Sequence, residues 1–398
     1  MSIDRQLTSK IALLCQMATL IGLAQGAAGY HFLKKTFKSK TSPSSSHSFA
    51  PTLWSGISIL KPMHGLEPML KEALTCFFRL NYPKFELIFG FQNPKDPAIA
   101  LVEALQKEYP HVSSRIIIGQ YDNSVNRKIA NLANMLPAAQ HNYYVFSDSD
   151  IHVRPDYLNH IAQTLQRPQV GVVTTLYGGY PASSTRVREF GAAAINHIFL
   201  PGVALSRALG REDCLGATIA LHKQTLHQIG GIESLRQHVA DDALIGKKIL
   251  ALGLHIAVAP TPTWTTVGEK KWRDLFSHEL RWGRTIRSIF PAGFAASVLQ
   301  MPLFWASLAV LLQPKKAKSW LFFLAAYGLR YKVNQKINSL FAIPERHAVV
   351  HTLLRDVFSV GNVIISFCGT KVSWRGQTVT INNDKRVFRD LKHRKSGN

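Results

Sequence analysis

Acidic residues and cysteines are both scarce in this chain of 398 residues. There are 24 Asp and Glu against 47 Lys and Arg, and four cysteines at positions 15, 76, 214 and 368. The cysteines are scattered without CxxC spacing, so neither a zinc site nor a disulfide framework is indicated, and a reducing cytoplasm is the simplest compartment. No internal repeat is evident.

The shortage of acidic residues leaves a strong positive charge, with a pI near 10. Such a charge suits nucleic acid, an anionic membrane face or phosphorylated substrates. Four lysines within 34–40 directly follow an uncharged run, and the tail 371–398 carries eight basic residues against two acidic ones after another apolar run. Because the charge clusters beside apolar runs, it indicates the positive-inside pattern of a membrane protein and no nucleic-acid partner.

Two long stretches contain no charged side chain. Ile11–Leu33 is long enough to cross a hydrocarbon core of roughly 30 Å as a helix. A cleaved signal peptide is the alternative, but the lysines follow the run, which favours an uncleaved anchor and a cytoplasmic domain after it. Pro291–Gln313 predicts a second membrane helix. Trp320–Leu329 and Thr352–Cys368 remain open between a hairpin arm, a re-entrant piece and interfacial helices.

Between these stretches the hydrophobic pattern alternates between strand and helix. This alternation predicts an α/β domain with a parallel, doubly wound sheet and helices on both faces. Strands are expected at Gly56–Leu60, Phe85–Phe91, Arg115–Ile118, Tyr143–Ser147, Val170–Leu176 and Gly216–Leu221. Helices are expected at about Glu67–Leu80, Ala98–Tyr109, Lys128–Gln140, Pro155–Leu165, Ala240–Leu252 and, with a basic amphipathic pattern, Trp272–Ile289.

The resulting domain plan has five parts. We expect an N-terminal anchor with its basic flank at 1–40, a polar linker at 41–50, the α/β domain at 51–289, a C-terminal membrane region at 290–370 and a basic cytoplasmic tail at 371–398.

Two carboxylates follow a predicted buried strand. Asp148 and Asp150 follow Tyr143–Ser147, at the edge where ligands bind in an open parallel sheet. Oxygen ligands there suit a divalent cation, Mg²⁺ or Mn²⁺, shared with a substrate's phosphates. The alternative is a solvated turn that caps the helix beginning near Pro155.

Asp96 and Asp242 are further candidates. Asp96 follows the strand Phe85–Phe91 at the same edge, where it can accept hydrogen bonds from a nucleotide's ribose or base, or else cap the next helix. Asp242 stands at a helix start, next to Asp241, where an N-cap is the bland interpretation. As a functional group, it can remove the proton from an attacking hydroxyl.

A basic helix carries the last motif. His278 and Arg281 share one helical face, and Trp282 adjoins them. The arginine can neutralise a departing diphosphate and the indole can stack on a sugar or a lipid, whereas a juxtamembrane basic helix is the alternative.

Taken in order and spacing, the motifs resemble ceramide-glucosyltransferase-like enzymes, which belong with the family 2 and 21 glycosyltransferases. The resemblance covers roughly Pro51–Ser288 and rests on SILKPMHG, FFRLNYPKFELIF, the turn Asp96–Ile99, NRKIANL at Asn126–Leu132, DSDI at Asp148–Ile151, ADD at Ala240–Asp242 and HELRW at His278–Trp282.

The resemblance implies a GT-A fold and a role for each matched residue. Asp96, Lys128, Asp148, Arg281 and Trp282 would bind the nucleotide sugar, Asp148 and Asp150 would hold the metal, and Asp242 would be the general base. The chain is also similar to the bacterial branch associated with hopanoid biosynthesis, which has a late WRG segment like that at 374–376. It departs from eukaryotic ceramide enzymes at His278, where they have Gln or Arg, and at Asp150, where they have Gly.

The sequence therefore predicts an inverting, UDP-sugar-dependent glycosyltransferase in a bacterial inner membrane, multi-pass, with its catalytic domain in the cytoplasm. The favoured substrates are UDP-N-acetylglucosamine and a hopanoid lipid acceptor such as bacteriohopanetetrol. Ceramide glucosylation from UDP-glucose is the alternative. A non-catalytic, membrane-anchored protein that binds nucleotide sugar or nucleic acid is an interpretation from a different class.

Overall fold

The protein is described from a computed structural model that covers residues 2–38, 55–120, 124–344, 348–374 and 377–380. The predicted linker 41–50 and most of the basic tail lie outside these residues. The chain forms two compact units. We call Phe37–Tyr177 with Glu212–Gly268 the sheet unit, and Met1–Thr36 with Gly178–Arg211 and Glu269–Lys385 the helical unit.

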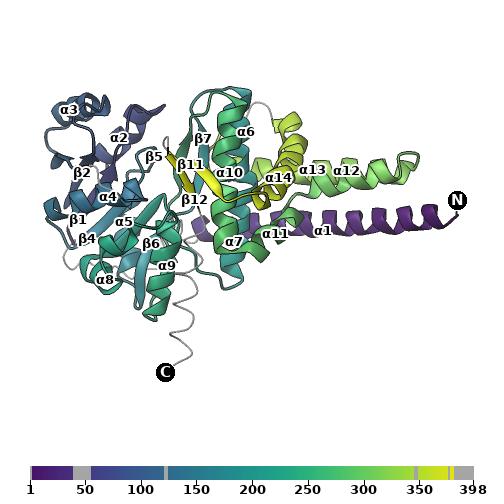
Figure 1. The fold of residues 1–398 in the computed structure, drawn as a ribbon, viewed down its shortest axis with the longest axis horizontal. Coiled ribbons are helices and arrows are strands. Elements are labelled where there is room, and N and C mark those ends of the chain that lie inside the picture. Colours follow the sequence, from purple (N-terminus) through teal and green to yellow (C-terminus); the bar gives the residue numbers. More distant parts are fainter. Residues whose placement is uncertain (1, 39–54, 121–123, 345–347, 375–376, 381–398) are drawn as a thin grey trace. The chain divides into compact units, whose positions relative to one another are not determined.

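A seven-stranded sheet in the order β3-β2-β1-β4-β8-β6-β9 forms the centre of the sheet unit (Figure 1). Its neighbours are parallel except at β8, which runs antiparallel to both β4 and β6. The strands are β1 (Ile57–Pro62), β2 (Phe85–Phe91), β3 (Ser114–Ile118), β4 (Tyr143–Ser147), β6 (Val170–Thr174), β8 (Thr218–His222) and β9 (His255–Val258). The mostly parallel sheet is as predicted; the reversed β8 and the strand β9 were not.

Helices cover both faces of this sheet, and the inner strands β1, β2, β4 and β8 are buried on both faces. Along β4, Val145 packs into one core, whereas Tyr144 and Phe146 pack into the other. This alternation follows from the two-residue period of a strand. One face carries α2 (Leu70–Phe78), α3 (Ala98–Glu108) and α5 (Tyr157–Leu165), and the other carries α4 (Arg127–Met135), α8 (Lys223–Gln228) and α9 (Asp241–Ala251).

A short antiparallel strand pair follows the central strands. In the sheet unit, β5 (Ile151–His152) pairs antiparallel with β10 (Thr263–Val267). This pairing turns the chain after β4 back against β10, which brings Thr265 opposite Ile151. Strand β7 (Tyr177–Pro181) runs from the end of the sheet unit into the helical unit.

The helical unit begins with one long apolar helix. Helix α1 (Ser2–Lys38) contains Gln6–Phe37, which by length and composition is the one uninterrupted described helix able to cross a membrane. The other elements are α6 (Arg186–Ala194), a π-helical turn at Ile195–Phe199, α7 (Leu200–Ala208), α10 (Trp272–Ile289), α11 (Pro291–Ala296), α12 (Pro302–Leu312), α13 (Ala317–Leu340), α14 (Ala348–Phe367), β11 (Lys371–Trp374) and β12 (Gln377–Thr380).

The prediction of one unbroken helix over Pro291–Gln313 is wrong. The stretch is broken into Pro291–Gln300 and Pro302–Leu312, which meet at an angle of 63°. The break falls at Met301, because Pro302 has no amide hydrogen to continue a helix and disfavours helical geometry at the residue before it. By length and composition, such a pair passes the test for one bent membrane span or a re-entrant loop.

Candidate active site

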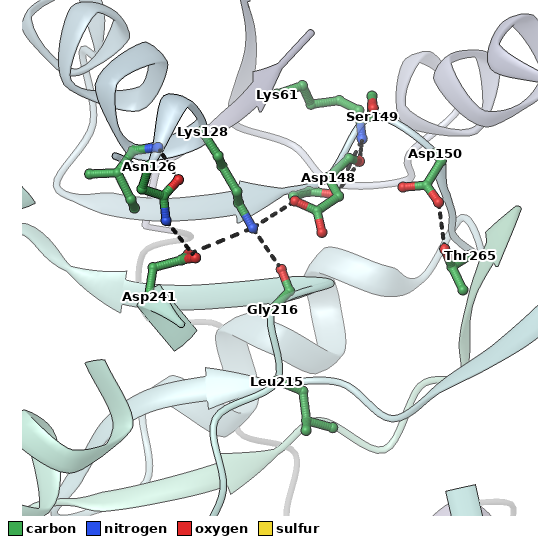
Figure 2. A network of polar contacts seen from close by, with 12 residues as sticks. Lys61, Asn126, Lys128, Asp148, Ser149, Asp150, Leu215, Gly216, Asp241 and Thr265 are labelled. Carbon is green, nitrogen blue, oxygen red and sulfur yellow. Dashed lines mark hydrogen bonds and ion pairs between the residues drawn. The ribbon is translucent and has the colours of Figure 1, made fainter. Parts of the chain in front are cut away.

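Polar side chains from distant segments meet beyond the carboxyl end of β4 (Figure 2). Asp148 follows β4 directly, Lys128 lies in the first turn of α4, Asp241 opens α9, and Gly216 precedes β8. The parallel strands β1, β2 and β4 all end at this edge, which is where a ligand crevice is expected.

Lys128 is the centre of the cluster. Its Nζ lies 2.6 Å from Asp148 Oδ1 and 3.8 Å from Asp241 Oδ2, and it donates a hydrogen bond to the Gly216 carbonyl at 3.1 Å. Burial alone would lower the pKa of this ammonium, but the two carboxylates outweigh burial and raise the pKa above its ordinary value. Lys128 therefore stays charged at physiological pH, and its ammonium group holds Asp148 and Asp241 on either side of it.

Asn126 joins the starts of two helices. Its side-chain oxygen accepts a hydrogen bond from the Ile129 amide at 3.1 Å, which makes it the N-cap of α4. Its amide nitrogen donates to Asp241 Oδ1 at 3.0 Å and to the His238 carbonyl at 2.9 Å. One fully buried side chain thus fixes both Lys128 and Asp241 relative to the sheet.

Lys61, near the end of β1, contacts the chain where β4 ends. Its side chain is fully buried at the end of β1, and its Nζ donates to the Asp148 carbonyl at 2.8 Å and to Ser147 Oγ at 3.2 Å. The nitrogen also lies 3.6 Å from the centroid of the Phe77 ring. Burial lowers the pKa of Lys61 to about 7, although Asp150 and Asp148 work in the opposite direction.

The two predicted metal ligands point in different directions (Figure 2). Asp148 faces Lys128, whereas Asp150 Oδ2 accepts a hydrogen bond from Thr265 Oγ1. Within the described residues, no group of three His, Cys, Asp or Glu side chains is placed to hold a metal. Two carboxylates nevertheless fit Mg²⁺ or Mn²⁺, because these ions take one or two protein carboxylates and fill their shells with water and substrate phosphates.

The electrostatics at Asp150 also favour a cation. Burial, together with the negative charges of Glu67 and Asp148, raises the pKa of Asp150 to about 6, against the effect of the Thr265 hydrogen bond. Ser149, between the two aspartates, donates to Glu67 Oε2 at 2.7 Å and so keeps a third carboxylate nearby. A positive ion at this place would relieve the repulsion among the carboxylates.

Asp242 differs from its neighbour Asp241. Asp241 is buried and bonded to Lys128 and Asn126, whereas Asp242 is half-buried and accepts a hydrogen bond from the Ala243 amide at 2.8 Å. A methyl group placed on Gly216 would lie 3.1 Å from Asp242 Oδ2, so the glycine leaves this oxygen uncovered. Burial and the charge of Asp241 raise the pKa of Asp242 to about 7. A carboxylate with such a pKa is well suited to act as a base.

Asp96 is engaged with the backbone. Its Oδ2 accepts a hydrogen bond from the Gly65 amide at 2.8 Å, and its Oδ1 accepts one from the Ala98 amide at 2.9 Å. These are the contacts of the capping interpretation, and they hold the loop after β1 against the start of α3. Each carboxylate oxygen can accept a second hydrogen bond, so nucleotide binding by Asp96 stays a prediction.

Arg281 and Trp282 lie on α10, in the helical unit. The Trp282 indole packs edge-on against the His278 ring at 4.6 Å between centroids, and His278 Nδ1 is bonded to Glu269. Burial alone would raise the pKa of Glu269, but His278 and Arg281 lower it below its ordinary value. Glu269, which precedes α10, therefore lies close enough to His278 and Arg281 to feel their charge.

Three residues of the site were not assigned a role from the sequence: Lys61, Asn126 and Glu67. A lysine inside an apolar strand was the available signal for Lys61, because lysine is almost never fully buried unless it is paired. Asn126 precedes a helix and is a favoured N-cap residue. Glu67 had no local signal, since its relation to Ser149 exists only in the folded chain.

The comparisons with known proteins agree with this fold. The family model described as glycosyl transferase family 21 matches residues 14–387. Ceramide glucosyltransferase 1 from Caenorhabditis elegans is 27% identical over 257 residues, which cover 63% of this chain and 53% of that protein. The ceramide glucosyltransferase from Komagataella phaffii is 32% identical over 142 residues, or 35% and 27% of the two chains.

A solved structure shares the fold. The mannosyltransferase PcManGT from Pyrobaculum calidifontis, in complex with GDP-Man and Mn²⁺, superposes with a TM-score of 0.52 at 16% identity and covers 88% of this chain and 99% of its own. The GT-A fold predicted from the sequence is thereby confirmed. The chain spans about half the length of the Caenorhabditis elegans relatives. On the match over residues 14–387, the chain belongs to glycosyl transferase family 21.

Proposed function

We propose that this chain transfers a sugar from a UDP-sugar to a hydroxyl group of a membrane lipid, with inversion at the anomeric carbon. The observation that carries the proposal is the cluster of Lys128, Asp148, Asp241 and Asp242 at the carboxyl edge of a family 21 domain. The names of the relatives support glucose as the sugar and ceramide as the acceptor, so UDP-glucose and ceramide are the first pair to test.

In the proposed reaction, Asp242 removes the proton from the acceptor hydroxyl as its oxygen attacks the anomeric carbon. The bond from that carbon to the diphosphate breaks, and its electron pair leaves with UDP. Lys128 keeps Asp148 oriented and contributes fixed positive charge at the edge where the diphosphate would lie. Arg281 is proposed to neutralise the leaving diphosphate, and Asp96 and Trp282 to bind the donor.

We also propose that Asp148 and Asp150 hold a divalent cation together with the diphosphate. When bound, the cation supplies positive charge against the charge that develops on the leaving group. The excess of carboxylates around Asp150 supports this assignment. EDTA in excess should abolish transfer, and Asp148→Asn should be more damaging than Asp150→Asn, because only Asp148 also bonds Lys128.

The lipid acceptor fits a membrane-attached protein. Helix α1 is long and apolar enough to cross a membrane, and the bent pair α11 and α12 adds a second apolar stretch. We propose that these segments keep the chain at a membrane, with the sheet unit on the cytoplasmic side. The multi-pass inner-membrane location predicted from the sequence stays a proposal.

A second pair of substrates is UDP-N-acetylglucosamine and a hopanoid polyol such as bacteriohopanetetrol. It is favoured by Asp150 and His278, where the sequence departs from eukaryotic ceramide enzymes. Both residues have definite partners, Thr265 and Glu269 respectively, so the departures have structural consequences. The hydrogen bond from Thr265, for instance, needs the carboxylate at position 150.

The test is a transfer assay on the full chain in lipid nanodiscs with Mn²⁺. UDP-glucose and UDP-N-acetylglucosamine are each offered with ceramide and with bacteriohopanetetrol, and the lipids are read by mass spectrometry. A glycolipid of the expected mass supports the proposal and names the pair. Absence of any glycolipid, while UDP-sugar still binds by calorimetry, would overturn lipid transfer and favour a non-catalytic binding protein.

A further inference from the structure

Glu279 lies in the same HELRW motif as Arg281, but it serves a different face of α10. At about 100° per residue, Glu279 lies about 160° around the helix axis from Arg281. Its side chain is buried, with 7% of the residue exposed, and it points into the helical unit. A contact at Glu279 therefore controls how the opposite face of α10 is turned.

Arg355 of α14 makes that contact. Its Nη1 donates to Glu279 Oε1 at 2.8 Å and its Nη2 to Glu279 Oε2 at 2.7 Å, so the pair is bidentate. Its Nε donates to Ser359 Oγ at 3.0 Å, and its Nη1 also lies 3.3 Å from the Phe190 carbonyl. The guanidinium is fully buried and stands 4.4 Å and 4.8 Å from the ring centroids of Phe190 and Phe358.

This geometry fixes rotation as well as distance. A bidentate arginine–carboxylate pair is planar, and both of its hydrogen bonds are kept only at one orientation of the two groups. The two phenylalanine rings hold the guanidinium in its plane, because an arginine stacks on aromatic faces. Turning α10 about its axis would break one of the two bonds to Glu279.

We propose that Arg355 is a positioning residue, which fixes the rotation of α10 through Glu279 and so sets the direction of Arg281. This inference rests on the proposed function only for the role of Arg281. It gives a purpose to Arg355, one of two charged residues that interrupt the apolar pattern of α14. It also predicts that the C-terminal helices affect the rate of sugar transfer without touching either substrate.

The expected effect is on rate and not on stability. Replacing a buried ion pair with apolar residues of similar size is often neutral or stabilising, whereas removing one partner alone leaves an uncompensated charge. Glu279→Leu combined with Arg355→Met should therefore fold with a Tm within about 3 °C of the wild type. The double variant should lose the fixed rotation of α10, and its kcat should fall about 10–100-fold with a nearly unchanged KM for the donor.

A double-mutant cycle shows whether the effect passes through Arg281. In an Arg281→Ala background, the Glu279→Leu and Arg355→Met changes should cost no further activity, because there is no arginine left to aim. The single variant Arg355→Lys should show less than half of the wild-type kcat, since lysine cannot make the bidentate contact with Glu279. If the Glu279→Leu and Arg355→Met changes lowered kcat by the same factor in the Arg281→Ala background as in the wild type, the proposal would be overturned.

The matched control is a second buried ion pair, found among the described residues of the helical unit. Arg330 and Asp356 are 3% and 1% exposed and lie 3.2 Å apart, and Asp356 also accepts from the Leu303 amide of α12. Arg330→Met with Asp356→Asn removes this pair and keeps both partners of the hydrogen bonds between Arg355 and Glu279. It should keep kcat within about twofold, whereas a loss as large as in the Glu279 and Arg355 variant would show a general packing effect and overturn the proposal.

An activity-independent readout separates this proposal from the proposed function. With 5-fluorotryptophan incorporated, the ¹⁹F NMR line assigned to Trp282 by Trp282→Phe should be single in the wild type and broadened or split in the Glu279→Leu, Arg355→Met variant. If the wild type transfers no sugar to any lipid, the proposed function fails and this line decides the inference alone. A single, unshifted line in the variant would overturn it.

Discussion

At the scale of single residues, Asp242 and Asp241 should show opposite behaviour when each is changed to Asn. Asp242→Asn removes the base and should lower kcat about 10²–10⁴-fold while sparing UDP-sugar binding. Asp241→Asn places an amide near the Lys128 ammonium, so it should cost about 1 kcal/mol of stability and keep most of the activity. Turnover, donor affinity by calorimetry and Tm are measured on both proteins.

The reverse result would show that the base is misassigned. If Asp242→Asn turns over normally, or if Asp241→Asn is the inactive protein with an unchanged Tm, the roles given to the two aspartates are wrong. Gly216→Ala is a useful third variant, because a methyl group 3.1 Å from Asp242 Oδ2 would crowd the oxygen without removing its charge.

The raised pKa of Asp242 predicts a pH dependence of rate. Because the base must be ionised, kcat/KM for the acceptor should fall about tenfold per pH unit below an apparent pKa of about 7. Stability should move the other way. The folded-state pKa is raised above the unfolded value, so this contribution to stability is fully present below the unfolded pKa of 3.8 and is lost as the pH rises through 7.

These opposite signs make the profile diagnostic. A rate that falls while Tm holds or rises between pH 7.5 and about 5.5 indicates titration of a base and not acid unfolding. The acid limb should be missing from the residual activity of Asp242→Asn. If kcat/KM of that variant fell equally steeply at low pH, the titration would belong to another group, with Asp150 the first to examine.

At the scale of elements, the end of β1 is predicted to support the turn after β4. Lys61→Met keeps the apolar stem and removes the hydrogen bonds to Ser147 and the Asp148 carbonyl. Donor affinity with Mn²⁺ should fall about fivefold, which corresponds to the loss of roughly 1 kcal/mol of orienting hydrogen bonds. Calorimetry of UDP-sugar binding measures the loss.

The same substitution should not reduce stability near pH 7. The folded-state pKa of Lys61 is lowered to about 7, so the buried ammonium opposes folding as the pH falls from the unfolded value of 10.5 toward 7. Lys107→Met, at an exposed position of α3, is the control and should change neither quantity. A large drop in Tm for Lys61→Met with unchanged donor affinity would contradict the supporting role.

At the scale of the whole molecule, membrane attachment should be hydrophobic as well as electrostatic. Salt screens the attraction between the positive flanks and anionic lipid, but it does not weaken the burial of apolar side chains from α1. Both 1 M salt, where the screening length is about 3 Å, and carbonate should therefore leave the protein in the membrane pellet. Immunoblotting of pellet and supernatant measures this.

Release by salt alone would indicate surface binding through charge, and release by carbonate would show that Gln6–Phe37 does not span a membrane. For a spanning helix, we expect the protein to stay in the pellet after both washes and to be released only by a mild detergent.

Local patterns determined much of the fold. Phe85–Phe91, Tyr143–Ser147 and Trp272–Ile289 begin and end where the sequence predicted, because strand and helix periods and their turn residues are local properties. The same reasoning located Asp148 and Asp150 at a strand exit. It could not show that the two carboxylates point apart, since that depends on Thr265, more than a hundred residues away.

From the sequence alone, the α/β class, the long apolar helix near the N-terminus and the glycosyltransferase family could be predicted, together with the sheet edge proposed here to carry the site. Tertiary structure alone decided that β8 is antiparallel, that Lys128 joins Asp148 to Asp241, and that Arg355 meets Glu279. The physical reason is that hydrophobic periodicity specifies which face of an element is buried, but not its partner. Partners between distant residues are chosen only when the whole chain has packed, because a buried charge must then find its counter-charge or hydrogen bond.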